Sequence, residues 1–413
     1  MTAMSRGASG PRTAHRRRLL LVGSGRHGRP YLTAAARRGA RVALLDNPTT
    51  LASERTRTLL QDDDDTYAVT TDDPADWVAA AYRALADGPV DGVVAFAEMH
   101  VVAAALVAEE LGLPGPGLRA AVVSRDKALQ RALFTRHGIA QPAYELADDA
   151  DHALRHASGR YPVVVKPRDG SGSAGVRLLS NEDDLRAWSS RPDRPATFLV
   201  EQYLDGPELS VECVVQHGHL VLVAPTRKTT TPPPHFVEIG HRVPADVTSD
   251  EQARLERTSD AVARALGVRD GLLHLEVRLC DGVPYVLEVA VRTPGDHILE
   301  LHALAHGLDV FDAVVALALG YQVDLRRTHD GAAATWFATP APGQVERVTG
   351  VDEVRALAGV VDLRVDVAPG RSTAAPASSA DRAASAVLRA PDAAGLDELQ
   401  RRVAETLVIS TAP

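Results

Sequence analysis

Short hydrophobic runs of strand length alternate with alanine-rich or amphipathic segments along most of the chain. In the first hundred residues an apolar run at 19–22 leads into a glycine-rich turn, and a second run at 42–45 ends at Asp46. A glycine turn and a helix between two such strands are typical of a Rossmann-like α/β unit. Because the run at 90–96 adds a later parallel strand, residues 18–118 are predicted to form an N-terminal α/β domain.

The pattern continues through a larger region and then changes near the C-terminus. Strands and helices alternate over 119–330, where we predict a second α/β and α+β domain with a central lid at about 140–204. Beyond it, short strands near 333–337 and 360–367 precede an amphipathic final helix. We therefore predict a small α+β subdomain over 331–413.

Two local segments carry further expectations. A helix is predicted over 121–137, with Arg125, Lys127 and Arg131 as basic residues of a surface helix. The segment 225–234 contains four prolines, which remove backbone donors, so it is predicted to be an exposed loop.

Composition narrows the class of protein. The 45 basic and 54 acidic residues are intermixed and leave a net charge of -9, so no basic footprint for nucleic acid is expected. No apolar run is long enough to span a bilayer. The two cysteines lack the spacing of a metal knuckle or disulfide framework, which favours a cytoplasmic protein. Residues 1–17 are expected to be disordered.

The most informative motif is the transition at residues 161–175 from a β-branched strand into a loop of glycine and serine. The strand brings Lys166 to this loop, where glycines permit backbone conformations that turn N–H groups toward phosphate oxygens. The Gly-Lys-Ser/Thr ending of a Walker A loop is absent. A hairpin or linker is the plain alternative. The candidate phosphate-binding residues are Lys166, Gly170, Ser171, Gly172 and Ser173.

Two acidic residues form a candidate metal site. Glu276 and Glu288 lie on consecutive strand-like segments separated by a turn at 280–284, so a hairpin would place them side by side. Mg²⁺ prefers carboxylate oxygens. Solvated charges on the wet face of two strands are the alternative explanation.

The chain resembles the ATP-grasp superfamily in four motifs and in their order and spacing. These motifs are the loop of glycine and serine, the segment 200–212, His274-Leu275-Glu276 and Glu288-Val289-Ala290-Val291-Arg292. The resemblance implies ATP as a substrate, Mg²⁺ as the metal with Mn²⁺ as an alternative, and formation of an acyl phosphate that an amine then attacks. It assigns Lys127 and Lys166 to the phosphates, and Glu276 and Glu288 to the metal. The segment 199–204 resembles the hinge between domains of this superfamily, where the Glu201 carbonyl and the Leu204 N–H would hydrogen-bond adenine. The Glu208 carboxylate would accept hydrogen bonds from the ribose hydroxyls.

The same resemblance extends to L-amino-acid ligases and related amide synthetases of small-peptide or natural-product pathways. Their Glu-x-x-His element matches Glu238 and His241, which would bind the ammonium of a donor amino acid and shape its pocket or move a proton. Arg292 would stabilise the transferring phosphate or the oxyanion, with a structural ion pair as the alternative. One departure is Ala290, because most family members have a metal-binding asparagine there.

Several alternatives stay open. Glu98, after the 90–96 strand, is either a substrate ligand or a helix N-terminal acid. The turn at 23–28 with Asp46 also matches a dinucleotide fingerprint, so an NAD(P)-binding oxidoreductase is a rival. A donor acid that is not an amino acid is another rival. The expected partners are a small carboxylate and an amine, with no nucleic acid or membrane, and a homodimer is an open possibility.

Overall fold

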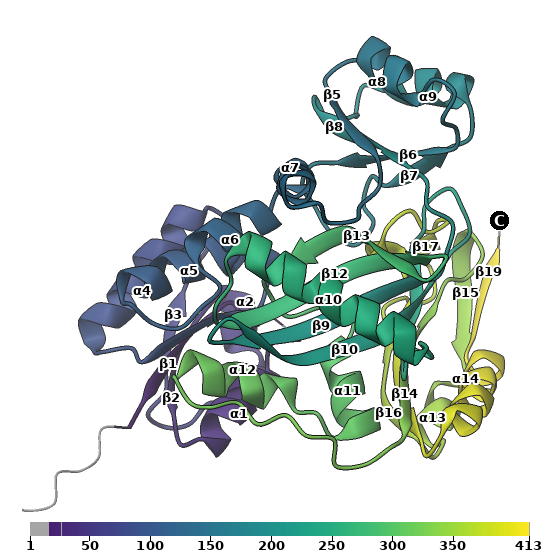
Figure 1. Cartoon of the computed structure of the whole chain (residues 1–413). Coiled ribbons are helices and arrows are strands. Elements are labelled where there is room, and N and C mark those ends of the chain that lie inside the picture. Colours follow the sequence, from purple (N-terminus) through teal and green to yellow (C-terminus); the bar gives the residue numbers. More distant parts are fainter. Residues whose placement is uncertain (1–15, 26, 413) are drawn as a thin grey trace, which may run out of the picture.

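The computed structural model describes residues 16–25 and 27–412. Most of the predicted disordered segment, 1–17, lies outside the described residues, whereas Arg16 and Arg17 donate hydrogen bonds to the Gly39 and Leu319 carbonyls. The chain forms an N-terminal α/β domain, a lid, and a large antiparallel sheet that is extended by the C-terminal residues (Figure 1).

The N-terminal domain contains a parallel sheet of four strands in the order β3-β2-β1-β4. Its central strand is buried on both faces, because Leu19 and Leu21 pack with α1 and α12 while Leu20 packs with α4 and α5. The predicted strand, turn, helix and strand are therefore confirmed. The elements are β1 (Arg18–Val22), α1 (Pro30–Arg37), β2 (Arg41–Asp46), α2 (Pro48–Ala52), α3 (Glu54–Arg57), β3 (Asp65–Ala68), α4 (Pro74–Asp87), β4 (Gly92–Ala95), η1 (Glu98–His100) and α5 (Val101–Glu110).

The glycine turn after β1 is closed by the chain's own carboxylate. One oxygen of Asp46, a residue only 2% exposed, accepts hydrogen bonds from Ser24 N at 2.7 Å, Ser24 Oγ at 2.9 Å and Gly25 N at 3.0 Å. A Cβ added to Gly23 would lie 2.1 Å from Nδ1 of His100. Asp46 therefore holds the turn together and is too buried to receive a ribose.

This geometry gives the first testable expectation. NADH fluorescence should not change on titration with the protein, because Asp46 already engages the amides that a dinucleotide would need. Saturable enhancement of NADH fluorescence that is lost in Asp46→Asn would contradict this expectation. It would favour the hypothesis that the protein is an NAD(P)-binding oxidoreductase.

The single helix predicted over 121–137 is wrong, because the chain forms two helices, α6 (Leu118–Ser124) and α7 (Lys127–His137). Asp126 separates them with an extended backbone, and its side chain accepts hydrogen bonds from Ala128 N and Leu129 N. An aspartate in this conformation is a helix N-cap. The break turns α7 toward the lid and directs Lys127 into the site described below.

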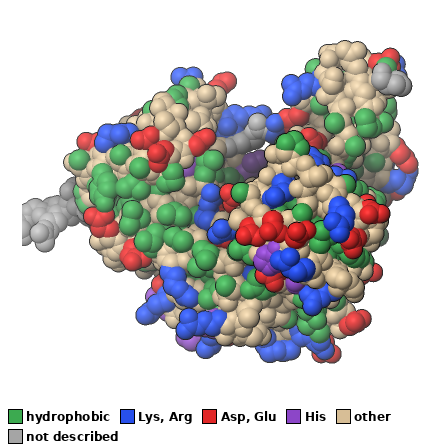
Figure 2. All heavy atoms as spheres, turned by 90° about the horizontal axis from the view of Figure 1, so that it is seen from above, with side chains coloured by type: hydrophobic (Ala, Val, Ile, Leu, Met, Phe, Trp, Pro, Cys, Tyr) green, Lys and Arg blue, Asp and Glu red, His purple; other side chains and the backbone are tan. Residues whose placement is uncertain are grey.

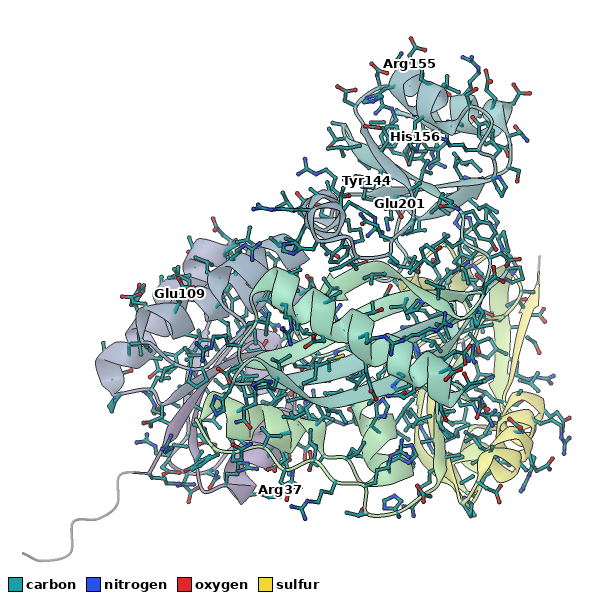
Figure 3. All side chains as sticks on the ribbon, in the orientation of Figure 1. Arg37, Glu109, Tyr144, Arg155, His156 and Glu201 are labelled. Atoms are coloured by element: carbon teal, nitrogen blue, oxygen red, sulfur yellow. The ribbon has the colours of Figure 1, made fainter. Side chains whose placement is uncertain are left out.

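The lid is a four-stranded antiparallel sheet in the order β5-β8-β6-β7, covered by α8 and α9. It stands apart from the rest of the molecule (Figure 1), and its strands and helices run from Tyr144 to Gln202. Tyr144 and Glu201 are register partners on the side of the lid nearest the large sheet, while Arg155 and His156 lie on α8 at its far side (Figure 3). The elements are β5 (Tyr144–Ala147), α8 (Ala150–Ala157), β6 (Val163–Pro167), β7 (Arg177–Leu179), α9 (Glu182–Ser189) and β8 (Phe198–Gln202).

The large sheet has eight strands in the order β13-β12-β9-β10-β11-β14-β18-β16. Alternate residues of β9 face opposite sides, since Val211 and Cys213 pack with α10 and Val214 packs with α12. The elements are β9 (Glu208–Gln216), β10 (His219–Thr230), β11 (Glu238–Val243), α10 (Ser249–Leu266), β12 (Gly271–Cys280), β13 (Val283–Ala290), α11 (Ile298–His306) and α12 (Val310–Ala318).

The C-terminal residues are joined to this sheet rather than appended beside it. β14 pairs with β11, and β18 and β16 follow, while three short strands form a separate sheet in the order β17-β15-β19. The predicted strands near 333–337 and 360–367 and the final helix are confirmed. The elements are β14 (Ala332–Ala338), β15 (Gly343–Thr349), α13 (Val351–Arg355), β16 (Val360–Val365), β17 (Ser372–Thr373), η2 (Ser379–Asp381), β18 (Ala384–Ala390), α14 (Ala393–Thr406) and β19 (Val408–Ala412).

The exposed loop predicted over 225–234 is mostly wrong. Pro225 lies inside β10, a central strand, opposite Val211 of β9. On the other side β11 pairs with β10 only from Arg227 onward, so at Pro225 the strand has one neighbour and the missing N–H is tolerated. Only the stretch from Thr231 to Val237, which carries the three consecutive prolines, is a loop.

The surface agrees with the balanced composition. Acidic and basic side chains are interspersed on the face shown in Figure 2. Among the described helices none is long and apolar enough by itself to cross a bilayer, and the pair α11 and α12, which passes together, is bent by 112°.

Candidate active site

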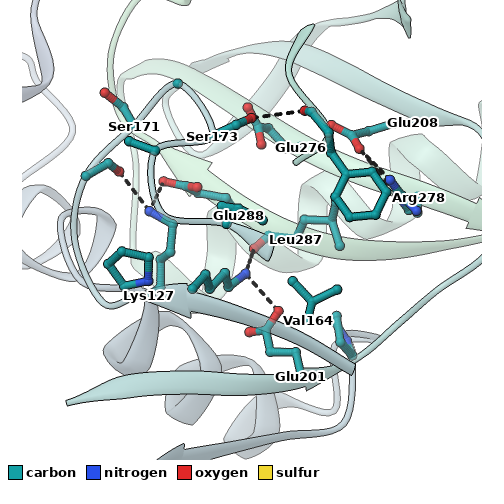
Figure 4. A pocket seen from close by; sticks show the side chains of 18 of the residues that line it. Lys127, Val164, Ser171, Ser173, Glu201, Glu208, Glu276, Arg278, Leu287 and Glu288 are labelled. Carbon is teal, nitrogen blue, oxygen red and sulfur yellow. Dashed lines mark hydrogen bonds and ion pairs between the residues drawn. The ribbon is translucent and has the colours of Figure 1, made fainter. Parts of the chain in front are cut away.

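A cavity of about 1050 Å³, open solvent at its mouth included, lies between the lid and the β12–β13 edge of the large sheet (Figure 4). Lid, hinge, loop and sheet each contribute walls. It brings together the residues that the sequence predicted for the nucleotide and the metal: Lys127, Lys166, Gly170, Ser171, Gly172, Ser173, Glu201, Leu204, Glu208, Glu276, Glu288 and Arg292.

The loop between β6 and β7, residues 168–176, is called the glycine loop. Gly170, Gly172 and Gly175 have φ of +92°, +65° and +76°, a region that side chains disfavour. Within the described chain, the N–H groups of residues 170–173 donate no hydrogen bond. Four free backbone donors in a left-handed glycine loop are a suitable cradle for phosphate oxygens.

Two buried ammonium groups flank this loop. Lys127 Nζ donates to the Gly170 carbonyl at 2.9 Å and lies 3.0 Å from Glu288 Oε1. Lys166 Nζ lies 2.8 Å from Glu201 Oε2 and donates to the Leu287 carbonyl at 3.4 Å. Burial lowers the pKa of Lys166 to about 8, although Glu201 partly offsets this effect.

Lysine is concentrated in this site. The sequence contains three lysines among its 45 basic residues, and Lys127, Lys166 and Lys228 are 7%, 6% and 6% exposed at the same cavity or beside it. The other 42 of these 45 residues are arginines, so a reagent that modifies side-chain amines can label only residues of this site.

The surface role predicted for Arg131 is wrong. Its side chain is fully buried and makes two hydrogen bonds to Glu201, at 2.7 and 3.2 Å, beneath the lid. Glu201 is thus held between two cations, Arg131 and Lys166, and stays ionised because they outweigh the effect of burial on its pKa. The sequence predicted a role only for the Glu201 carbonyl and contained no signal for this buried pair.

The hinge has the features of a nucleotide-base site. Leu204 N makes no hydrogen bond with the described residues, so it is free to donate one to a nucleotide base. The Leu204 carbonyl accepts a hydrogen bond from Arg278 at 2.7 Å. Arg278 also donates to Glu208 at 3.1 Å and lies over the stacked rings of Tyr203 and Phe236. Sequence reasoning missed Arg278 and this aromatic pair.

The predicted hairpin of the metal site is confirmed, since Glu276 and Glu288 are register partners on β12 and β13. Two side-by-side carboxylates at a phosphate-binding loop fit a hard divalent cation. Lys228 and His274 lower the pKa of Glu276 well below its usual value despite burial, so it is ionised. Ala290 lies opposite His274 and offers no ligand atom.

Lys228 was missed by sequence reasoning and links three subsites. Its ammonium lies 3.1 Å from Glu208, 2.7 Å from Glu238 and 3.0 Å from Glu276. The three carboxylates raise the pKa of Lys228 well above its usual value despite burial. Lys228 therefore neutralises part of the charge where the predicted ribose, donor and metal positions meet.

His274 adds a second fixed cation. Burial alone would lower its pKa, but Glu212 at 2.8 Å and Glu276 at 3.6 Å outweigh burial and raise the pKa to about 9. The positive imidazolium therefore orients Glu276 at neutral pH.

A second cavity, of about 1460 Å³ including open solvent, adjoins the first at the glycine loop. Here Glu238, His241 and Asp296 place ligand atoms within 4.8 Å of one another. Asp296 accepts two hydrogen bonds of 2.7 Å from Arg382 and lies 3.2 Å from His241. Because Arg382 and Lys228 already balance these acids, the cluster suits an organic ammonium better than a further metal ion.

The C-terminal subdomain takes part in this pocket, which the sequence-based view of it as a small appendage missed. Ser379 Oγ donates to Glu238 at 3.1 Å, and Ser379 N donates to the Gly172 carbonyl at 3.0 Å. Ser379 is 141 residues from Glu238 in the sequence, and Arg382 is 86 residues from Asp296. No local sequence motif therefore predicts these contacts.

Arg292, which lines both cavities, is paired with Glu98, which lines the second. Arg292 Nε donates to Glu98 Oε2 at 2.7 Å, so the ion pair considered for Arg292 is present. Glu98 follows β4 at the carboxyl end of the parallel sheet, as predicted. The pair joins the N-terminal domain to the segment that follows β13 and also lines the second cavity.

Comparison with known proteins agrees with this arrangement. Residues 32–115 match the family model of the ATP-grasp N-terminal domain, residues 159–300 that of the ATP-grasp domain, and residues 335–412 that of the L-amino acid ligase C-terminal domain 2.

Among whole proteins, the chain is 29% identical over 337 residues to the uncharacterized protein y4rH of Sinorhizobium fredii, covering 78% of this chain and 69% of that protein. It is 28% identical over 327 residues to carnosine synthase 1 of Gallus gallus, covering 73% of this chain but only 35% of the synthase. The L-amino acid ligase from Bacillus licheniformis has a similar structure, with a TM-score of 0.80 and 20% identity over 97% of this chain and 100% of that chain. With three domain models matching in chain order and the whole fold shared, the chain belongs to the ATP-grasp superfamily.

Proposed function

We propose that the protein is an ATP-dependent carboxylate–amine ligase that joins a donor amino acid to an amine and releases ADP and phosphate. The observation that carries this proposal is the juxtaposition of the glycine loop, the paired Glu276 and Glu288, and the Glu238 cluster within two adjoining cavities. Similarity to carnosine synthase 1 and to an L-amino acid ligase supports a peptide-bond-forming activity.

The first chemical step is phosphorylation of the donor. A carboxylate oxygen attacks the γ-phosphorus of ATP, the bond to ADP breaks, and an acyl phosphate forms. Lys127, Lys166 and the free N–H groups of the glycine loop bind and orient the phosphates. Glu276 and Glu288 would hold Mg²⁺ or Mn²⁺, which neutralises phosphate charge when bound.

The second step forms the amide. The neutral amine nitrogen attacks the acyl carbon, the carbon–oxygen bond to phosphate breaks, and the leaving phosphate takes up the proton that the nitrogen loses. Arg292, which lines both cavities, is suited to stabilise the oxyanion and the leaving phosphate. The lid and the glycine loop form walls of the nucleotide cavity and would limit access of the water that hydrolyses an acyl phosphate.

The donor ammonium is assigned to Glu238, with His241 and Asp296 beside it. One observation favours a second candidate, an amide synthetase whose donor lacks an ammonium. Glu238 already accepts one ammonium, that of Lys228 at 2.7 Å. Each carboxylate oxygen accepts two hydrogen bonds, so a substrate ammonium still fits beside Lys228.

Phosphate release tests the activity directly. The purified protein with Mg-ATP is assayed against amino acids singly and in pairs, and products are identified by mass spectrometry. We expect phosphate release to require a donor amino acid and product masses to match a dipeptide or amide. Release on simple non-amino carboxylates equal to that on the best amino acid would favour the second candidate. No release with any acid would refute ligase activity.

Glu238→Gln tests the donor assignment. The variant should lower kcat/KM for the donor amino acid about tenfold or more, because a charged hydrogen bond is replaced by a neutral one. Affinity for ATP should stay near that of the wild type. Glu346→Gln, an exposed acid on β15, is the matched control. A uniform loss in all substrates would point to a structural role for Glu238 instead.

A further inference from the structure

Ser379 contacts both the phosphate cradle and the assigned donor site. Its N–H donates to the Gly172 carbonyl at 3.0 Å, and its Oγ donates to Glu238 Oε2 at 3.1 Å. Within the described chain, no other hydrogen bond joins the glycine loop to a residue beyond 300. One residue of the C-terminal subdomain therefore connects the two places where ATP and the donor would bind.

The contact with Gly172 sets the direction of a phosphate donor. A trans peptide is planar, so the Gly172 carbonyl and the Ser173 N–H point in opposite directions. Because Ser379 N holds the carbonyl, the Ser173 N–H points away from the C-terminal subdomain. Ser173 lines the nucleotide cavity but not the second cavity. The position of Ser379 therefore determines how the glycine loop presents one of its free donors.

The place of Ser379 depends on few contacts, because residues 374–378 before it form no helix or strand. Besides its contacts with the loop and Glu238, the Ser379 carbonyl accepts a hydrogen bond from Arg382 Nε at 2.8 Å. Arg382 also donates to both carboxylate oxygens of Asp296, each at 2.7 Å. Ser379 is thus tied directly to Glu238 and, through Arg382, to Asp296. These are the two acids of the cluster assigned to the donor ammonium.

An ammonium bound at this cluster would restrict Ser379 further. Glu238 Oε1 is held by Lys228 at 2.7 Å, whereas Oε2 accepts from Ser379 Oγ. A carboxylate oxygen accepts two hydrogen bonds, so Oε2 can bind a substrate ammonium without releasing the hydroxyl. With a cation at each oxygen, the Glu238 carboxylate becomes a fixed anchor for Ser379 and, through it, for the Gly172 carbonyl.

We propose that Ser379 is a positioning residue that couples the two substrates, so that donor binding orders the glycine loop and strengthens nucleotide binding. The inference rests on the proposed ligase function and deepens it by naming the residue that links its two substrate positions. The first ligand orders the loop, and the second then binds without that entropic cost, which makes binding cooperative. The coupling is reciprocal, so the nucleotide strengthens donor binding by the same factor.

Isothermal titration calorimetry measures this coupling without turnover. The coupling ratio is the Kd for Mg-ADP alone divided by the Kd for Mg-ADP with a saturating donor, the amino acid that gives the fastest phosphate release. We expect a ratio of at least about five in the wild type, the lower end of common coupling factors. Ser379→Ala keeps the N–H contact with Gly172 but loses the hydroxyl contact with Glu238, so its ratio should fall below about two.

Two further variants separate positioning from general stability. Ser379→Thr keeps the N–H and the hydroxyl and should keep the wild-type ratio, as should Ser372→Ala, which changes an exposed serine of β17 in the same subdomain. A wild-type ratio near one overturns the coupling without any variant. Weaker binding of both ligands to Ser379→Ala at an unchanged ratio would show a structural role only and would overturn it too.

Hydrogen exchange gives a second measurement that needs no nucleotide. The Ala174 and Val176 amides donate to carbonyls within the glycine loop, so their exchange reports on its order. The donor alone should slow exchange in the peptide that covers residues 168–176 of the wild type, and it should not do so in Ser379→Ala. Equal slowing in both proteins would show that the donor orders the loop by another route and would refute the role of Ser379.

The outcomes also separate this proposal from the general function. Donor-dependent phosphate release together with a wild-type ratio near one would leave the ligase standing and refute the coupling. Absence of phosphate release with every acid would refute both.

Discussion

Lys166→Met is expected to abolish most turnover, with kcat/KM for ATP lower by about 100-fold or more, because a fixed cation at the transferring phosphate is lost. Methionine keeps the length of the buried side chain, and Glu201 keeps its ion pair with Arg131 at 2.7 Å, so the lid should remain folded. Circular dichroism and thermal unfolding check this. Arg168→Gln, which removes a partly exposed cation from the same loop, is the control.

The pH dependence gives the same residue a distinct signature. Burial lowers the pKa of Lys166 to about 8 in the free protein. Phosphate contacts favour the charged ammonium, so nucleotide binding takes up a proton wherever the free side chain is neutral. Affinity for Mg-ADP should therefore be constant below about pH 7 and fall as the pH rises through 8.

Calorimetry in buffers of different ionisation enthalpy measures this proton uptake. Uptake should appear near pH 8 to 9 in the wild type and be absent in Lys166→Met. Because the sequence has only three lysines, labelling with ¹³C at lysine Cε should give three signals, one of which titrates near 8 and shifts with ADP. Wild-type nucleotide affinity and turnover in Lys166→Met would overturn the phosphate-site assignment.

The second large effect is expected at the paired carboxylates. Glu276→Gln and Glu288→Gln should each lower kcat by about 100-fold or more and raise the Mg²⁺ concentration needed for half-maximal activity, because a hard cation requires charged oxygen ligands. Neither change alters side-chain size. Asp281→Asn, in the turn of the same β12–β13 hairpin, is the matched control for hairpin integrity.

Metal binding can be read without catalysis. Mn²⁺ bound with ADP gives an electron paramagnetic resonance signal, and both variants should weaken it in the protein complex. The two residues differ in their partners, since Glu288 contacts Lys127 at 3.0 Å and Glu276 contacts Lys228 at 3.0 Å. Unchanged Mn²⁺ affinity and unchanged Mg²⁺ dependence in both variants would refute the assignment of the metal site to this hairpin.

Several parts of the site were predictable because local sequence determines them. Glycines in a loop after a β-branched strand dictate the left-handed turns at Gly170, Gly172 and Gly175. A turn between two alternating strands dictates that Glu276 and Glu288 pair. The Rossmann-like start follows from strand, glycine turn and helix spacing in the same way.

Local rules also failed where context overrode them. Prolines argued against a strand at Pro225, yet its missing N–H lies where β10 has one neighbour. Basic residues on a helix argued for a solvated face, yet Arg131 is fully buried. Both errors arise because exposure depends on which element packs against a residue, and the residue's own neighbours in sequence do not specify it.

The sequence by itself therefore determined the superfamily, the glycine loop and the paired carboxylates, since each depends on residues close together in the chain. Only the tertiary structure decided the charge pairing around them. Lys228 and Glu276 are 48 residues apart, Arg131 and Glu201 are 70 apart, and Ser379 and Glu238 are 141 apart. Sheet order and lid docking bring these partners together, and buried charges without such partners would be too costly to keep.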